Sequence, residues 1–324
     1  MARGRASSPR VGSRGYARRR VERLSTRAGT PPLSGSFDTE LRVAIDAAWR
    51  AGAIQRDLFE RLEQVTPKGR RDVVTEADYR SEAAIIETIR RAFPHDAILA
   101  EESGGHGVTL ADAIDGPRGG AAASRTWFID PLDGTVNFAN GIPFFCAAIG
   151  FAVAGRPVVG VLFDPSREEL LQAVRGRGAF RDGEATTGRR PFRVGSKESL
   201  EECLFGIVHQ RGFLRTVARL RPRVRAVRDL GSAALAIGYV GGGRLDGYIQ
   251  PRGLSPWDLC AAGLIAEEGG ATVSAFDGSP WFRYPVSSGG QTPRSRRSDR
   301  RVPSLSALVA APGIHAQLLG LLHG

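Results

Sequence analysis

Residues 127–143 read "WFIDPLDGTVNFANGIP", an apolar run that enters two aspartates, a proline and a glycine. Pro, Asp and Gly are the usual turn residues, so a solvated surface turn would account for the composition. The alternative is that Asp130 and Asp133 are gathered for chemistry. The acids elsewhere in the chain help to decide between these two interpretations.

Three other acidic positions stand where an apolar segment ends or a helix begins. Asp78 follows "VVTEA", Glu101 and Glu102 follow "AILA", and Asp258 follows "SPW". Taken singly, Asp78 and Asp258 are well explained as helix N-caps, and the glutamates as a solvated strand end. Ligands of open α/β sheets collect at such strand ends, however. The conjunction of these acids, in this order, predicts a site.

Carboxylates that share a dry cleft repel one another unless a cation neutralises them. No Cys/His cluster accompanies the acids, so an all-oxygen ligand group favours a hard ion, and Mg²⁺ above others. Gly134 allows the backbone to approach a phosphate, and N–H groups at a helix start, here near Thr135, point toward an anion. Two metals can then activate a water and stabilise the leaving oxygen. The set therefore predicts metal-dependent phosphate chemistry.

Helical and strand-like stretches are mixed along the chain, which predicts a layered α/β architecture. Apolar spacing predicts helices at 41–62, 83–93, 211–220, 231–242, 257–270 and 314–322, and strands at 97–103, 126–131, 144–153, 157–164, 168–174, 203–208, 224–228 and 305–311. Residues 72–78 and 246–251 are expected to be extended. The strands over 144–174 are expected to be antiparallel, and residues 104–125 to form a Gly/Ala-rich loop with one weak helical turn.

The formal charge of +11 is concentrated in two segments. Residues 1–36 carry nine arginines and one acid, residues 285–303 carry five arginines and one acid, and the remainder is nearly neutral. Both segments are rich in Ser, Gly and Pro, so we expect a disordered tail (1–36) and a disordered insertion (285–303) in one catalytic domain (37–324). Organellar targeting and nucleic-acid contact are the alternatives for the tail.

The chain has no apolar run near the roughly 20 residues that a spanning helix requires. Its three cysteines, Cys146, Cys203 and Cys260, are widely separated and odd in number. This usage fits a reducing compartment better than a disulfide framework. We therefore expect a cytoplasmic protein without membrane contact.

At this point the motifs resemble a known family. "WFIDPLDGTVNF", "AEES" and "SPWDLCAAGLIAEEGG" are similar to those of the inositol monophosphatase family of Mg²⁺-dependent, lithium-sensitive phosphatases, and "DVVTEAD" and "GSAAL" agree. The similarity runs from about residue 40 to 280 and resumes at 305–324. It implies an alternating αβαβα sandwich of the sugar-phosphatase type, a homodimer, and hydrolysis without a covalent enzyme intermediate.

The resemblance also implies a role for each matching residue. Glu101, Asp130 and the Leu132 carbonyl would bind a first metal, and Asp130, Asp133 and Asp258 a second. Thr135 and Glu101 would position the attacking water, with Asp78 supporting Thr135. The substrate would be contacted by Asp133, Gly134, Thr135, Ser232, Ala233 and Gln250.

The chain departs from the family pattern in three places. Relatives specific for inositol phosphate commonly have a glutamate before the Trp-Asp motif, where this chain offers Gln250, which carries no charge. The loop over 104–125 is longer than in compact members, and the resemblance gives the insertion at 285–303 no role. These departures bear mainly on which ester is cleaved.

The function expected from the sequence is Mg²⁺-dependent hydrolysis of inositol monophosphate or a similar small polyol or sugar phosphate. The alternatives within the superfamily are phosphatases of histidinol phosphate, fructose 1,6-bisphosphate, NADP(H) and 3′-phosphoadenosine 5′-phosphate. The alternative from another class is an RNA- or partner-binding protein on this fold. We expect nucleic-acid contact only through the Arg-rich segments.

Overall fold

The computed structural model of the protein describes residues 37–61, 65–67, 73–106, 125–183, 190–208, 213–282 and 304–323. The predicted tail, the predicted insertion and residues 107–124 of the predicted loop lie outside these ranges. None of the helices in the described ranges is both long and apolar enough to cross a membrane.

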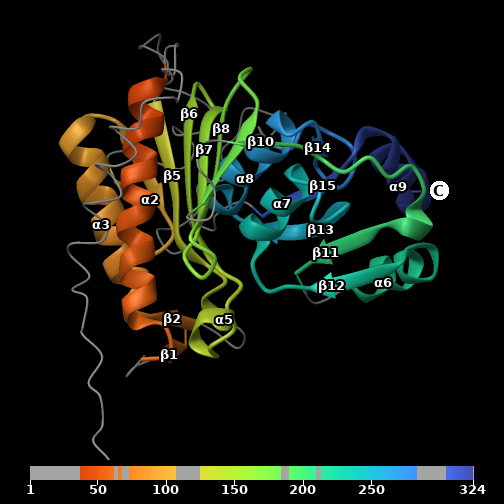
Figure 1. Cartoon of the computed structure of the whole chain (residues 1–324), viewed down its shortest axis with the longest axis horizontal. Helices are drawn as coiled ribbons and strands as arrows, with labels where there is room; N and C mark the ends of the chain where they lie inside the picture. Colours follow the sequence, from red (N-terminus) through yellow and green to blue (C-terminus); the bar gives the residue numbers. More distant parts are fainter. Residues whose placement is uncertain are drawn as a thin grey trace, which may run out of the picture.

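Five layers alternate across the molecule, which confirms the predicted αβαβα sandwich (Figure 1). Helices α2 (Asp38–Leu58) and α3 (Glu76–Ala92) cover one face of an eight-stranded sheet. Helices α7 (Ala233–Gly241) and α8 (Pro256–Glu268) lie between that sheet and a five-stranded one. Helices α6 (Leu214–Leu220) and α9 (Pro312–His323) cover the outer face of the second sheet.

The eight-stranded sheet has the order β10-β9-β8-β7-β6-β5-β3-β4, and only the β3–β5 pair is parallel. The predicted antiparallel strands over 144–174 are thus confirmed. The strand bounds are β3 (Ala97–Ala100), β4 (Gly104–His106), β5 (Arg125–Asp133), β6 (Cys146–Val153), β7 (Arg156–Asp164), β8 (Glu169–Val174), β9 (Ala179–Gly183) and β10 (Arg190–Phe192). Strands β1 (Val65–Pro67) and β2 (Val73–Thr75) pair separately.

The second sheet has the order β12-β11-β13-β15-β14, so β15, which follows β14 in the sequence, lies inside it. Strand β15 (Leu305–Ala310) pairs antiparallel with β13 (Gly247–Leu254) on one side and with β14 (Thr272–Ser274) on the other. Strands β11 (Leu204–Ile207) and β12 (Ala226–Asp229) run parallel, with β12 at the edge. The short helices η1 (Leu200–Glu202) and η2 (Arg221–Arg223) precede β11 and β12.

Several short strands were not predicted. Residues 104–106 form β4 rather than the start of a loop, because this Gly-rich segment pairs its backbone with the edge of β3. Strands β9, β10 and β14 are three to five residues long and show no apolar alternation, so their pairing is set by neighbouring strands.

Glycines bring helix α8 close to the large sheet. A Cβ atom at Gly150 on β6 would lie 2.5 Å from Cys260 Sγ, and one at Gly160 on β7 would lie 2.7 Å from the Ala261 carbonyl oxygen. Since α8 carries Asp258 at its start, this close packing fixes how far that carboxylate lies from the strands.

Candidate active site

A β-bulge at the end of β5 brings two aspartates to one cavity. Asp130 pairs with Ala148 and Asp133 with Cys146, so three residues of β5 span the length of two on β6. In a regular strand, side chains three positions apart point to opposite faces of the sheet. The extra residue reverses that alternation. Asp130 and Asp133 therefore both line a cavity of about 160 Å³.

The turn after the bulge requires glycine. Gly134 has φ +99°, and a Cβ atom there would lie 3.1 Å from the Phe144 carbonyl oxygen and 3.2 Å from Ser232 Cβ. Such a φ strains any residue with a side chain. The turn starts the short helix α5 (Thr135–Ala139), so Gly134 and Thr135 both line the cavity.

Asp78 makes both kinds of contact that the sequence suggested: it caps a helix, and it hydrogen-bonds to Thr135. One carboxylate oxygen accepts the backbone N–H of Thr75 at 2.8 Å and the Thr75 hydroxyl at 2.6 Å, which caps helix α3. The other oxygen lies 2.9 Å from the Thr135 hydroxyl, for which the Leu132 carbonyl oxygen is an alternative acceptor at 3.0 Å. Asp78 is buried, so it joins the start of α3 firmly to the wall of the cavity.

Glu101 lies just beyond β3 and also lines the cavity. The loop that carries it is held by Glu82 on α3, a residue that the sequence analysis did not single out. The buried Glu82 carboxylate accepts the N–H groups of Glu102 at 2.8 Å and Ser103 at 2.9 Å. A glutamate on the apolar face of a helix was the signal that could have identified it.

The first turn of α7 binds Asp133. The Asp133 carboxylate accepts hydrogen bonds from the Ser232 hydroxyl and from the backbone N–H groups of Ala233 at 3.1 Å and Ala234 at 2.7 Å. Ser232 and Ala233 were expected to contact substrate; the structure places them against Asp133, and Gly231 lines the cavity in their place.

Asp258 completes the set from the opposite side. It lies in the first turn of α8, where its carboxylate accepts the Ser255 N–H at 2.7 Å, and it lines the same cavity. Glu101 thus comes from the residues after β3, Asp130 and Asp133 from the end of β5, and Asp258 from the start of α8. The other residues that line the cavity are Leu132, Gly134, Thr135, Val136 and Gly231.

The structure does not bring Gln250 to the lining of this cavity. Gln250 is 2% exposed, and its amide oxygen accepts the hydroxyl of Tyr248 two residues earlier on β13. The Gln250 amide oxygen, which was expected to accept hydrogen bonds from substrate hydroxyls, is therefore already hydrogen-bonded to Tyr248.

The comparisons with known proteins agree with this geometry. The model of the inositol monophosphatase family matches residues 37–315. The chain belongs to the inositol monophosphatase family. Its members include an inositol-1-monophosphatase of Synechocystis, 40% identical over 79% of this chain and 85% of that protein, and a protein named Nus factor SuhB of Pasteurella multocida, 39% identical over 74% of this chain and 85% of that protein.

Solved structures of family members superpose well. The IMPase of Thermotoga maritima has a TM-score of 0.71 and 29% identity, covering 88% of this chain and 97% of the other. The inositol monophosphatase of Anabaena has a TM-score of 0.68 and 33% identity, covering 89% and 96%. A phosphatase of the inositol monophosphatase superfamily is therefore the supported class, and this family is in general metal-dependent.

The electrostatics of the cavity fit a cation. Burial raises the pKa of Asp130 well above its usual range, and the charges of Glu101, Asp133 and Asp258 raise it further. Burial also raises the pKa of Asp258, with Asp133 and Glu101 as the next causes. For Asp133, burial raises the pKa while the hydrogen bonds from Ser232 and the α7 amides oppose the rise. A bound cation would relieve this repulsion.

The donor set is all oxygen, which suits a hard ion. In the described ranges, no three Asp, Glu, His or Cys side chains lie close enough together to form a metal-binding cluster. Four carboxylates nevertheless line one cavity. Mg²⁺ also keeps several waters and uses few protein ligands directly, so an open set of carboxylates fits it.

The role of Glu82 is testable. Glu82→Gln is expected to lower kcat by about 10-fold and to raise the metal concentration for half-maximal activity, as changes behind metal ligands do. The amide supplies one acceptor oxygen for two N–H groups. The matched control is Glu87→Gln on the same helix, where the exposed carboxylate pairs only with Arg91 and should not affect the reaction. Equal metal dependence in both variants would contradict the role of Glu82.

Proposed function

We propose that this protein is a Mg²⁺-dependent phosphomonoesterase that hydrolyses a small polyol or sugar monophosphate, with inositol monophosphate as the first candidate. One observation carries the proposal: Glu101, Asp130, Asp133 and Asp258 line a single cavity whose wall includes the glycine turn at Gly134 and the Thr135 hydroxyl. The family membership and the name of the Synechocystis relative support the choice of ester.

The carboxylates of Glu101, Asp130, Asp133 and Asp258 and the Leu132 carbonyl would hold the metal ions. When bound, Mg²⁺ supplies charge neutralisation for the phosphate and lowers the pKa of water. The chain's own groups then do the rest. The N–H groups of Gly134 and Thr135 bind a phosphate oxygen, because the first N–H groups of a helix lack intrahelical partners.

Thr135, Asp78 and Glu101 orient the water. The Thr135 hydroxyl donates a hydrogen bond to the Asp78 carboxylate, so its oxygen can accept a hydrogen bond from a water in the cavity. Glu101, as a general base, takes the proton of that water as its oxygen attacks phosphorus. The bond between phosphorus and the ester oxygen breaks on the opposite side, and that oxygen takes a proton from solvent water and leaves as the alcohol, so no covalent bond to the enzyme forms.

A monophosphate is favoured over a bisphosphate or nucleotide by the composition of the cavity wall. None of the described lining residues is Arg, Lys or His. A second phosphate group would therefore meet carboxylates and an apolar Val136 without a cationic side chain to bind it. A neutral polyol has no such requirement.

The test is phosphate release from inositol 1-phosphate, fructose 1,6-bisphosphate, histidinol phosphate, NADP⁺ and 3′-phosphoadenosine 5′-phosphate with Mg²⁺ present. We expect kcat/KM for inositol 1-phosphate to exceed that for either bisphosphate by about 10-fold or more, equivalent to 1.4 kcal/mol. A preference for a bisphosphate would overturn the substrate class. No Mg²⁺-dependent release from any ester would overturn the enzymatic function itself.

The resemblance supports three further proposals about the same enzyme. We propose that it is a homodimer, which light scattering of the purified protein tests, and that Li⁺ inhibits it, which the same phosphate assay tests. We also propose a cytoplasmic location, supported by three buried cysteines that form no disulfide; imaging of the tagged full chain tests it.

A further inference from the structure

Six arginines are exposed on consecutive elements at the end of the molecule opposite to α2 and α3 (Figure 1). They lie on α6, η2, β12 and the residues between, within residues 213–230, whose only acid is Asp229. We call this surface the arginine face; its members are Arg215, Arg219, Arg221, Arg223, Arg225 and Arg228. The net charge did not reveal this cluster. Outside the two Arg-rich segments (1–36 and 285–303), acidic residues elsewhere in the chain bring the net charge close to zero.

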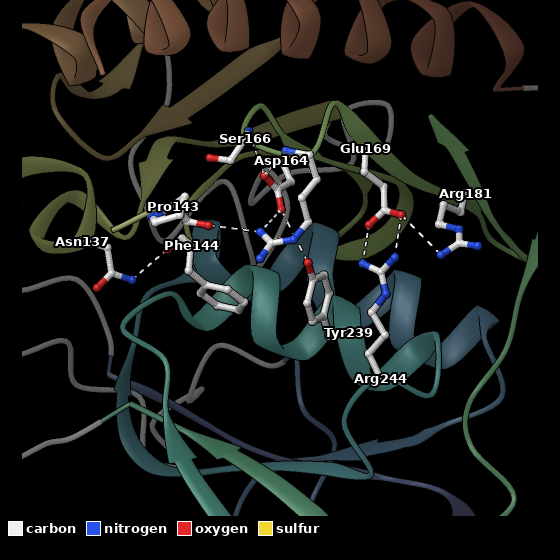
Figure 2. A network of polar contacts seen from close by, with 10 residues as sticks. Asn137, Pro143, Phe144, Asp164, Ser166, Glu169, Arg181, Tyr239 and Arg244 are labelled. Atoms are coloured by element: carbon white, nitrogen blue, oxygen red, sulfur yellow. Dashed lines mark hydrogen bonds and ion pairs between the residues drawn. The ribbon is translucent and has the colours of Figure 1, made fainter. Parts of the chain in front are cut away.

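Within the part of the chain that the structure describes, the arginine face has no acidic partners. Among the described residues, no carboxylate pairs with any of its guanidinium groups; Arg219 donates to the Leu322 carbonyl oxygen at 3.1 Å and Arg228 to that of Val227 at 3.2 Å. Eleven arginines elsewhere in the described ranges do pair with carboxylates. The contacts of Glu169 in Figure 2 illustrate this, since its carboxylate pairs with both Arg244 and Arg181. High arginine usage alone therefore does not explain the unpaired set.

We propose that the arginine face binds the phosphodiester backbone of a nucleic acid, an activity separate from the proposed phosphatase reaction. Guanidinium groups bind phosphate oxygens through two parallel hydrogen bonds and keep their charge at any physiological pH. A row of phosphates can satisfy several unpaired arginines at once, which one small anion cannot.

The composition of the face favours nucleic acid over an acidic protein. A stable protein interface has a buried centre of aromatic or apolar anchors. The exposed large apolar side chain here is Leu214, which is 71% exposed, and Phe213 is buried. Without an exposed aromatic ring on this face there is also no stacking platform for bases. Binding should therefore depend on charge and salt, with little preference for sequence.

The test compares two triple variants of the full chain. Arg221→Gln, Arg223→Gln and Arg225→Gln together remove three charges from the face. Arg61→Gln, Arg80→Gln and Arg91→Gln together remove three exposed charges that pair with Asp57, Glu76 and Glu87. Both proteins keep the Arg-rich segments and the same net charge, so a difference between them reports the face. Thermal unfolding checks that both are folded.

Binding is measured by fluorescence anisotropy with oligo(U) RNA, oligo(dT) and duplex RNA of about 16 units, in the range of known single-strand site sizes. Salt is varied between about 50 and 200 mM, where phosphate contacts change affinity strongly. We expect the face variant to lose affinity about 10-fold or more and to reduce the salt slope by about 2 on single strands, since each contact contributes about 0.7. The paired-arginine variant should resemble wild type.

Each other outcome overturns the proposal. Equal losses in both variants would assign binding to net charge or to the Arg-rich segments. Binding of polyglutamate as tight as that of RNA would make the face a site for acidic proteins, and no binding at low salt would leave it without this role. Phosphate release from inositol 1-phosphate should be unchanged in both variants, so failure here is distinguishable from failure of the proposed enzymatic function.

Discussion

Asp130→Asn is expected to abolish phosphate release and, at the same time, to stabilise the metal-free protein. The substitution is nearly isosteric and removes one charge from a set of four carboxylates that line one cavity, of which Asp130 and Asp133 are buried. Loss of a metal ligand should lower kcat on the order of 10³-fold or more. Without metal, the same change removes repulsion among Asp130, Glu101, Asp133 and Asp258, which is what raises the pKa of Asp130 beyond the effect of burial.

The stability effect has a defined pH dependence. Because the pKa of Asp130 is higher in the folded state, the folded protein holds more protons than the unfolded chain above about pH 4. Stability of the metal-free wild type should therefore fall as pH rises from about 4 toward the raised pKa. Asp130→Asn should flatten this fall, and Mg²⁺ should flatten it in wild type.

The measurements are thermal unfolding in chelator from acid to neutral pH, and phosphate release at saturating Mg²⁺. Activity within a few-fold of wild type would contradict the metal-binding role of Asp130. A lower melting temperature of Asp130→Asn in chelator at neutral pH would contradict the account of its electrostatics.

Asp133→Asn should abolish activity to a similar extent but destabilise the protein. Unlike Asp130, the Asp133 carboxylate accepts the Ser232 hydroxyl and the N–H groups at the start of α7 with both oxygens. An asparagine offers one acceptor oxygen, and its NH₂ group would face a donor. A buried donor left without an acceptor costs about 1–3 kcal/mol.

The two aspartate variants therefore form a matched pair, with similar loss of turnover and opposite effects on stability. Urea unfolding in chelator at neutral pH gives the free energy of unfolding for both. If Asp133→Asn is as stable as Asp130→Asn, the hydrogen bonds from α7 do not hold Asp133 as the structure shows. Circular dichroism confirms whether both remain folded.

The layers could be predicted from the sequence because they depend on periodic burial. The helical spacing from Leu41 onward and the apolar runs of β6 to β8 bury one face or both, and each forms as predicted. The short strands β9 and β14 could not be predicted, since their sequences have no period and their pairing comes from the adjacent strands.

Only part of the candidate site could be predicted from the sequence, for a similar reason. The acids Asp130 and Asp133 were found, but a spacing of three predicts opposite faces of a strand, and only the bulge against β6 places them in one cavity. Glu82 lies twenty residues before Glu102 in the sequence, so its contact depends on how α3 packs beside β3. The contact of Ser232 with Asp133 could not be predicted either, because helix α7 reaches Asp133 from the other half of the chain.

The position of β15 has a consequence for how the second sheet assembles during synthesis. This strand is made after β13 and β14, yet it lies between them, and its residues Ala307 to Ala310 are fully buried. Until it arrives, β13 and β14 each expose an unpaired edge that could pair with another nascent chain. The acids on β5 are made before β15, but α7 and α8, which hold Asp133 and carry Asp258, pack against a sheet that lacks an inner strand until β15 is made. A nascent chain stalled before residue 305 would therefore lack the strand that joins β13 to β14 beneath the helices that place these carboxylates.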